Sequence, residues 1–308
     1  MDAEPIPTVE KDRALRALDY ARRLSEAPLD ESPPPRPNAE EWRALSVNEL
    51  RLELDELIVK RNVEDALDYL QKSGALAVWM PEVDAMVGFS DGEWRHKDVW
   101  KHTKQVVKQS VPRLEVRWGA LLHDIGKLTT RNITEDGQVT FYGHSEVGAS
   151  MYRRRVRRRL GFEGALSDRI HFLILHHLRA SQYEESWTDA AVRRFYKQMG
   201  EGLRDLLDLS RADITTKRPE KRKRGVAQIS ALAKRVEALK AEDSKTSPLP
   251  KGLGELIMRD FGVPPSKRLG EIRQRLEDDA EAGHIEAGKE IDYYLGVLRA
   301  DPARYGLD

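Results

Sequence analysis

Hydrophobic residues recur every three or four positions along most of the chain, the spacing that places them on one face of an α-helix. The pattern predicts helical segments over residues 9–27, 46–76, 98–111, 117–124, 145–160, 165–178, 189–199, 201–214, 226–241 and 253–300. The best strand signal, over residues 139–142 after Asp136-Gly137, is long enough only for a small ribbon. The predicted fold class is therefore all-α.

Proline-rich segments divide this helical pattern. Five prolines occur between residues 28 and 37, a density that forbids regular structure and indicates a linker. Ser46, with Glu49 three residues later, has the capping-box pattern of a helix start. A second break occurs at residues 247–250. We predict an N-terminal helix with a proline-rich linker over residues 1–41, and helical regions over 42–95, 96–225 and 226–308.

Composition narrows the class of protein. The 308 residues, 40% of them apolar, are enough for one large or two modest domains. Lysine plus arginine and aspartate plus glutamate number 52 each, so net charge gives no hint of a polyanionic partner. The absence of cysteine excludes disulfides. No apolar run could span a membrane, and residues 1–5 lack the apolar core of a secretory signal, so we expect a cytoplasmic protein.

Histidines and aspartates on apolar faces are the candidate chemistry. His123-Asp124 lies in the apolar stretch of residues 121–127; His102 precedes it, and His144, His176-His177 and Asp213 follow. Helical phase places His177 within a buried stripe and Asp213 at the edge of another. Each histidine alone is more simply a hydrogen-bonded core residue, and Asp213 alone could pair with an arginine. Together, imidazoles and carboxylates on separate segments predict a transition-metal centre.

Two basic clusters are the other notable feature. Residues 153–159 carry six arginines on one predicted helix, and residues 217–224 follow Asp213 closely. Either cluster is a solvated face or a surface for a phosphate backbone. Lys127, one turn beyond Asp124, is a candidate for holding a phosphate oxygen; the alternative is a surface lysine. The candidate phosphate or RNA contacts are Lys127, Arg154, Arg158, Arg193 and Arg194.

The order His102, His123-Asp124, Asp213 resembles the signature of the HD superfamily of metal-dependent phosphohydrolases. The resemblance is closer to the C-terminal part of bacterial tRNA nucleotidyltransferases (CCA-adding enzymes) that carry an HD domain. The segments that carry it are residues 98–103, 121–127, 141–149, 176–179, 191–195 and 205–213, and residues 48–54 and 73–76 resemble the neck of those enzymes.

The resemblance implies an HD-domain helical fold over residues 96–225, flanked by neck helices over 42–95 and a C-terminal helical region. The nucleotidyltransferase head of the family needs a β-sheet, a glycine-rich loop and paired aspartates. The forty or so residues before the neck contain no strand pattern, no Gly-Gly pair and no Asp-x-Asp motif. We therefore expect this chain to lack the head.

By motif match, the resemblance assigns a first metal to His102, His123, Asp124 and Asp213. A second ion would bind His144 and His177, or His176 in its place, with Asp124 bridging. With so many imidazole ligands, one or two ions of manganese, nickel, cobalt or iron are expected rather than magnesium. Asp124, Lys127 and His144 are the candidate catalytic residues.

The implied function is metal-dependent hydrolysis of nucleotide or RNA-terminal phosphoesters, of the 2′,3′-cyclic phosphodiesterase, 2′-nucleotidase or phosphatase type, with tRNA among the candidate substrates. The alternative is a non-catalytic subunit that binds tRNA or another RNA and partners a separate nucleotidyltransferase. A nucleotide-sensing HD protein is a third interpretation. No sequence-specific DNA binding is expected, and the sequence predicts no oligomeric state.

Overall fold

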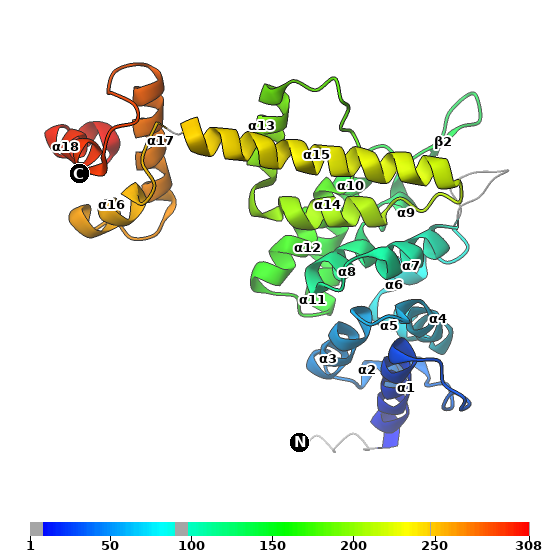
Figure 1. Ribbon diagram of the computed structural model, residues 1–308. Coiled ribbons are helices and arrows are strands. Elements are labelled where there is room, and N and C mark those ends of the chain that lie inside the picture. The colour runs from blue at the N-terminus through cyan, green and yellow to red at the C-terminus, as the bar shows by residue number, and fades with distance from the viewer. Residues whose placement is uncertain (1–8, 90–97, 247, 308) are drawn as a thin grey trace, which may run out of the picture. The chain divides into compact units, whose positions relative to one another are not determined.

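The computed structural model describes residues 9–89, 98–246 and 248–307, and these residues are almost entirely helical (Figure 1). The only sheet among them is a two-stranded ribbon, which confirms the predicted all-α class. The chain forms two compact units, Met1–Lys234 and Arg235–Asp308. Residues 1–5 and the predicted boundary at 95/96 lie outside the described residues.

The N-terminal helices form a small cluster of their own, blue to cyan in Figure 1. α1 (Val9–Glu26) packs against α3 (Val47–Ile58) and α4 (Val63–Ser73), followed by α5 (Ala75–Trp79) and α6 (Pro81–Asp84). The capping box of Ser46 and Glu49 is present at the start of α3. The hydrophobic pattern did not predict α2 (Ala39–Arg43), which begins after Asn38 because the Asn38 side chain and Glu41 form a second capping box.

The central helices surround α8 (Leu114–Leu122), which contacts α7 (Val99–Gln109), α12 (Gly164–His176) and α14 (Leu203–Ala212). Trp118, Leu121 and Leu122 on α8 are fully buried, as are Leu173 and Ile174 on α12. This core fixes the positions of the ends of three helices. The remaining elements are α9 (Lys127–Thr130), β1 (Asn132–Ile133), β2 (Val139–Thr140), α10 (His144–Met151), α13 (Asp189–Met199) and η2 (Gly200–Gly202).

Three local features differ from the predicted elements. The strand over residues 139–142 ends at Thr140, and Phe141 and Tyr142 lead instead into α10. The helix over 145–160 contains a π-helical segment, η1 (Tyr152–Val156), before α11 (Arg157–Arg159). The helix expected from residue 226 begins earlier, as α15 (Pro219–Thr246), because proline is favourable in the first helical turn. The basic run after Arg218 is therefore helical.

Buried polar contacts join the N-terminal cluster to the central helices. Arg159 donates two hydrogen bonds to the buried carboxylate of Glu82, at 2.6 and 3.0 Å. Burial alone would raise the pKa of Glu82, but the guanidinium of Arg159 lowers it below its ordinary value. The buried Arg117 guanidinium donates to the carbonyl of Ile58 at 3.4 Å. The two groups of helices therefore share a polar interface as well as an apolar one.

The C-terminal unit has a separate core. The predicted helical region over 253–300 is three helices, α16 (Leu253–Phe261), α17 (Lys267–Glu281) and α18 (Ile291–Ala300), followed by η3 (Ala303–Tyr305). Leu253, Ile257, Leu276, Tyr294 and Leu298 pack together in it. Of the predicted break at 247–250, residue 247 lies outside the described residues. None of the described helices is both long and apolar enough to cross a membrane.

Candidate metal centre

The structure brings six predicted residues together, four of them at helix ends. His123, His177 and Asp213 directly follow α8, α12 and α14, and His144 is the first residue of α10. His102 lies in the interior of α7. The carbonyl end of a helix carries partial negative charge, which stabilises a cation. Three such ends meet here and favour positive charge, whereas the N-terminal end of α10 at His144 opposes it.

The first ligand group consists of His102, His123 and Asp213. Nε2 of His102 lies 3.0 Å from Oδ1 of Asp213, and Nε2 of His123 lies 3.6 Å from the same oxygen. One oxygen of Asp124, Oδ2, also faces this group, 3.5 Å from His102 Nε2 and 3.2 Å from His123 Nε2. Two imidazoles and two carboxylates therefore surround one small volume.

The second ligand group consists of Asp124, His144 and His177, all buried. The other oxygen of Asp124, Oδ1, lies 3.6 Å from His144 Nε2 and 4.0 Å from His177 Nε2. The two histidine Nε2 atoms lie 3.1 Å apart. Because the two oxygens of Asp124 face different groups, the side chain is placed between two cation-sized volumes.

Contacts behind the rings decide which nitrogen is free. Nδ1 of His123, His144 and His177 each lies 2.8 Å from the backbone carbonyl three residues earlier in the chain. A carbonyl can only accept, so each Nδ1 carries a proton and, in the neutral ring, each Nε2 has a lone pair. The close Nε2 atoms of His144 and His177 then repel each other unless a cation lies between them. Nε2 of His123 is buried without a hydrogen-bond partner. These groups fit a metal.

Thr215 is a residue that the sequence reasoning missed. Its hydroxyl lies 2.9 Å from Nδ1 of His102, where it orients the ring in the way that the backbone carbonyls orient the other three. The available signal was its position two residues after Asp213. A hydroxyl at this spacing can support a ligand without being one.

Ionisation favours metal binding at most of these residues. Burial lowers the pKa of His177 to about 4 and lowers that of His144, so both rings are neutral near pH 7. Burial would raise the pKa of Asp124, but His123 and Lys127 hold it well below its ordinary value. His123 is the exception: burial lowers its pKa, but the carboxylates of Asp124 and Asp213 outweigh burial and raise it. Protons therefore compete with a metal ion at His123 more than at His144 or His177.

A close backbone contact sets the distance between the two halves of the site. A Cβ added to Gly126 would lie 2.0 Å from the carbonyl oxygen of His144 and 2.7 Å from the nitrogen of Gly148. Only glycine allows the chain after Asp124 to approach the start of α10 so closely. Gly126 therefore helps to place His144 against Asp124.

Lys127 lies beside the ligand groups. Its Nζ lies 2.7 Å from Oδ2 of Asp124, and its side chain is 19% exposed. Its ammonium also lies 5.6 Å from the centroid of the Phe141 ring. The side chain thus places positive charge at the edge of the ligand groups.

The other candidates lie elsewhere. The ring of His176 packs against Phe172, with centroids 4.8 Å apart, whereas His177 faces the ligand groups. Arg154 and Arg158 are exposed on η1 and α11, and Arg193 and Arg194 lie on α13. The structure brings none of these four arginines into the ligand groups.

The comparisons with known proteins agree with this geometry. Residues 98–238 match the HD domain family, which places this part of the chain in a superfamily of metal-dependent hydrolases. The A-adding tRNA nucleotidyltransferase of Deinococcus radiodurans is 30% identical over 254 residues, covering 80% of this chain and 57% of the relative. The CC-adding tRNA nucleotidyltransferase of Thermus thermophilus is 29% identical over 252 residues, or 79% and 55%.

The chain therefore contains an HD domain and is homologous, over that domain and its surroundings, to CCA-adding tRNA nucleotidyltransferases. A shorter match, 32% identity over 130 residues, is found with the multifunctional CCA protein of Haemophilus influenzae and covers 38% of this chain and 30% of the relative. The chain spans just over half the length of the first two relatives.

Proposed function

We propose that the chain is a metal-dependent phosphohydrolase with a two-metal centre that acts on nucleotide or RNA-terminal phosphoesters. The observation that carries the proposal is the pair of Nε2 atoms of His144 and His177, 3.1 Å apart. Both rings donate a hydrogen bond from Nδ1 to a backbone carbonyl, so the lone pairs of their Nε2 atoms face each other. A cation between the two atoms would remove this repulsion. A protein that used only the first ligand group would have no use for this arrangement.

In this proposal, His102, His123 and Asp213 would hold one ion and His144 and His177 the other, with Asp124 between them. Two bound ions would supply the chemistry of phosphoester hydrolysis, since metal ions polarise the phosphoryl oxygen and lower the pKa of water. The four imidazoles favour manganese, nickel, cobalt or iron over magnesium. The protein itself orients the rings through carbonyls and Thr215, and its apolar core excludes water from behind them.

Lys127 is the proposed phosphate contact. Its ammonium already lies at Oδ2 of Asp124, at the edge of the centre. From there we expect it to bind a phosphate oxygen that does not react, a contact that stabilises charge on a phosphoryl group. Asp124, Lys127 and His144 are therefore the proposed catalytic residues.

An exposed aromatic residue supports a nucleotide as the substrate. Tyr142 is 84% exposed and precedes the ligand His144 by two residues. A tyrosine so exposed offers its ring face to a nucleobase, and such stacking contributes about 1–3 kcal/mol per base. We infer that Tyr142 contacts the base of a substrate whose phosphate lies at the metals.

The test is a panel of phosphoesters with protein loaded with manganese. Nucleoside 2′,3′-cyclic phosphates, nucleoside 2′-phosphates and p-nitrophenyl phosphate should be hydrolysed, and a chelator should abolish turnover. Tyr142→Ala should raise KM for the nucleotides but not for p-nitrophenyl phosphate, and Tyr142→Phe should restore the original KM. A metal-loaded protein that hydrolyses none of these esters would contradict the proposed function.

A second candidate function is RNA binding without hydrolysis. Two observations favour it: exposed arginines at Arg154 and Arg158, and relatives whose names describe enzymes that act on tRNA. Arg193 and Arg194 remain proposed contacts of the same kind. In that case tRNA should bind with an affinity that falls steeply with salt, and the metal should change neither binding nor the RNA ends.

A further inference from the structure

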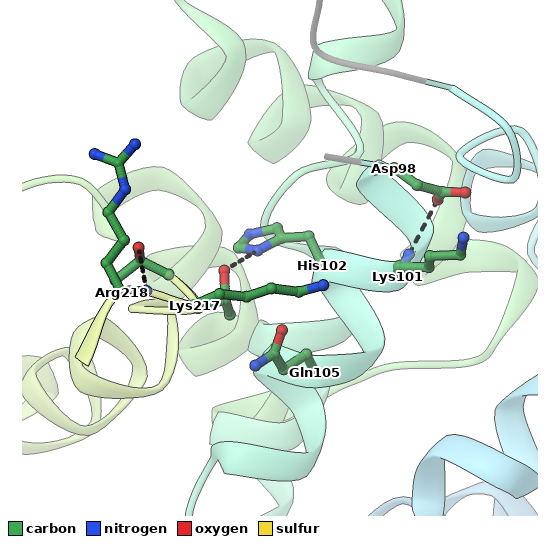
Figure 2. Close-up of a pocket in the computed structure, with 8 residues that line it drawn as sticks. Asp98, Lys101, His102, Gln105, Lys217 and Arg218 are labelled. Carbon is green, nitrogen blue, oxygen red and sulfur yellow. Dashed lines mark hydrogen bonds between the residues drawn. The ribbon is translucent and has the colours of Figure 1, made fainter. Parts of the chain in front are cut away.

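A hollow of about 470 Å³ lies on the outer side of His102 (Figure 2). Lys101, His102 and Gln105 on α7 form one wall, and Thr216, Lys217 and Arg218 form the other. Nε2 of His102 faces the metal ligands, while its Nδ1 contacts Thr215 beside the hollow. One imidazole ring therefore separates the proposed reaction centre from this hollow.

The hollow concentrates positive charge. Lys101, Lys217 and Arg218 line it, against one carboxylate, Asp98, whose oxygen accepts a hydrogen bond from the backbone nitrogen at the start of α7. Among the described residues, none of the three cations forms an ion pair or side-chain hydrogen bond. Figure 2 shows the Lys217 side chain between His102 and Gln105. The Arg218 side chain extends in another direction, away from Lys217. Unpaired like charges so close together favour a bound anion.

The positive charge continues along α15. Arg218 also borders a second hollow, of about 450 Å³, together with Lys221, Arg224 and one carboxylate, Glu220. Arg218, Lys221 and Arg224 form a row whose successive members are three residues apart in the chain. In a helix this spacing is a rise of about 4.5 Å. The start of α15 is fixed against the domain, because Arg222 donates to Gln109 at 3.2 Å and Gly225 packs on Ile214. The row of cations is thus held in place beside the first hollow.

We propose that this basic track, formed by Lys101, Lys217, Arg218, Lys221 and Arg224, binds the phosphates adjacent to the one that reacts. The substrate is then the end of a single-stranded oligonucleotide rather than a mononucleotide. A strand carries one negative charge per nucleotide. When its terminal phosphoester is at the metals, we expect the next phosphate to lie in the hollow on the outer side of His102. This inference rests on the proposed function and adds to it a substrate class.

The test compares substrates that differ only in length. A nucleoside 2′,3′-cyclic phosphate is compared with a dinucleotide and a tetranucleotide that end in the same cyclic phosphate. One additional phosphate bound by Lys217 and Arg218 should raise kcat/KM by about tenfold, the effect of one charge-assisted contact. The gain should appear mainly in KM, because the track contacts a part of the substrate that does not react.

Removal of the charges should remove the gain. K217Q/R218Q should lower kcat/KM for the dinucleotide by about tenfold while changing that for the mononucleotide less than twofold. The matched control is R16Q/R61Q, which removes two exposed cations of the N-terminal cluster, one on α1 and one in the turn before α4. It should preserve the length dependence. Equal kcat/KM for all three substrates would overturn the basic track and leave hydrolysis intact.

A binding measurement separates the two proposals. A fluorescent tetranucleotide with a 3′-phosphate should bind the wild-type protein and bind about tenfold more weakly to K217Q/R218Q. If no ester is hydrolysed but this difference is found, the track is supported and the hydrolase function fails. Equal binding to both proteins would overturn the track whatever the turnover.

Discussion

The two ligand groups share Asp124 but balance their charges in different ways. In the first group, His102 and His123 lie within 3.6 Å of carboxylate oxygens from both Asp124 and Asp213. In the second, His144 and His177 have one carboxylate oxygen between them and lie closer to each other than to it.

This difference indicates that the two ligand groups need a metal ion to different degrees to balance their charges. The carboxylates of the first group raise the pKa of His123, so protons compete with metal there. Burial lowers the pKa of both histidines in the second group, so a proton compensates poorly for their repulsion. A metal ion is therefore needed more by the second group, although the first offers more negative charge. Four variants test this comparison.

Asp124→Asn should have the largest effect because Asp124 serves both groups. The amide keeps the shape of the side chain but loses its negative charge. We expect kcat to fall by roughly 10³-fold or more, since each metal contributes several kcal/mol of charge stabilisation. Metal content, measured by elemental analysis, should fall well below two ions per chain. Full activity in this variant would contradict the entire mechanism.

His144→Ala should separate the groups. It removes one imidazole of the second group and relieves the repulsion at His177, while the first group keeps all its ligands. We expect the stoichiometry by titration to fall from two ions to one and kcat to fall by about 10²-fold. Added manganese should raise the melting temperature of the wild-type protein more than that of the variant. A wild-type protein that saturates at one ion would remove the second site.

Gly126→Ala should disturb the distance between Asp124 and α10. The added methyl group overlaps the carbonyl oxygen of His144, so backbone must move. We expect a loss of about 1–3 kcal/mol of unfolding free energy, with weaker binding of the second ion. Gly270→Ala is the control: Gly270 lies in a helix with open space around it, so alanine should stabilise by about 0.5–1 kcal/mol. Unchanged stability in Gly126→Ala would contradict the close contact.

Thr215→Val should have the smallest effect and act on the first group alone. The change removes the hydroxyl that contacts Nδ1 of His102 and keeps a branched side chain. Loss of such a contact behind a ligand weakens metal binding by about 10–100-fold. Calorimetric titration should show this loss for one of the two ions only, and Thr215→Ser should restore affinity. An equal effect on both ions would show that the groups are not independent.

That these side chains lie together was easier to predict from the sequence than how they are arranged. Helical phase and the His123-Asp124 pair indicated the buried positions because a polar residue within an apolar stripe is visible in one dimension. The bridging position of Asp124 was implied only by the family resemblance, because the directions of its two oxygens depend on how α8, α10 and α12 meet. The role of Gly126 was likewise hidden, since a close approach between two backbones involves residues far apart in the chain.

The basic clusters illustrate the same limit. Residues 153–159 and 217–224 look alike in composition, yet Arg159 binds the buried Glu82 and Arg157 donates to the carbonyl of Phe162. Part of the first cluster therefore holds the fold together. Charge density in a sequence cannot distinguish an arginine that stabilises an interface from one that faces solvent. The partner of Arg159, for example, lies 77 residues earlier in the chain.

The interface at Arg159 and Glu82 has a consequence for how this protein can be divided. A chain cut before residue 96 would keep Arg159 and Arg117 but lose the Glu82 carboxylate and the Ile58 carbonyl that bind them. Similarity to the two tRNA nucleotidyltransferases extends over more than 250 residues, far beyond the 98–238 segment that defines the HD domain. The HD domain should therefore be less stable when it is cut from its N-terminal helices, because these helices supply the acceptors for two of its arginines.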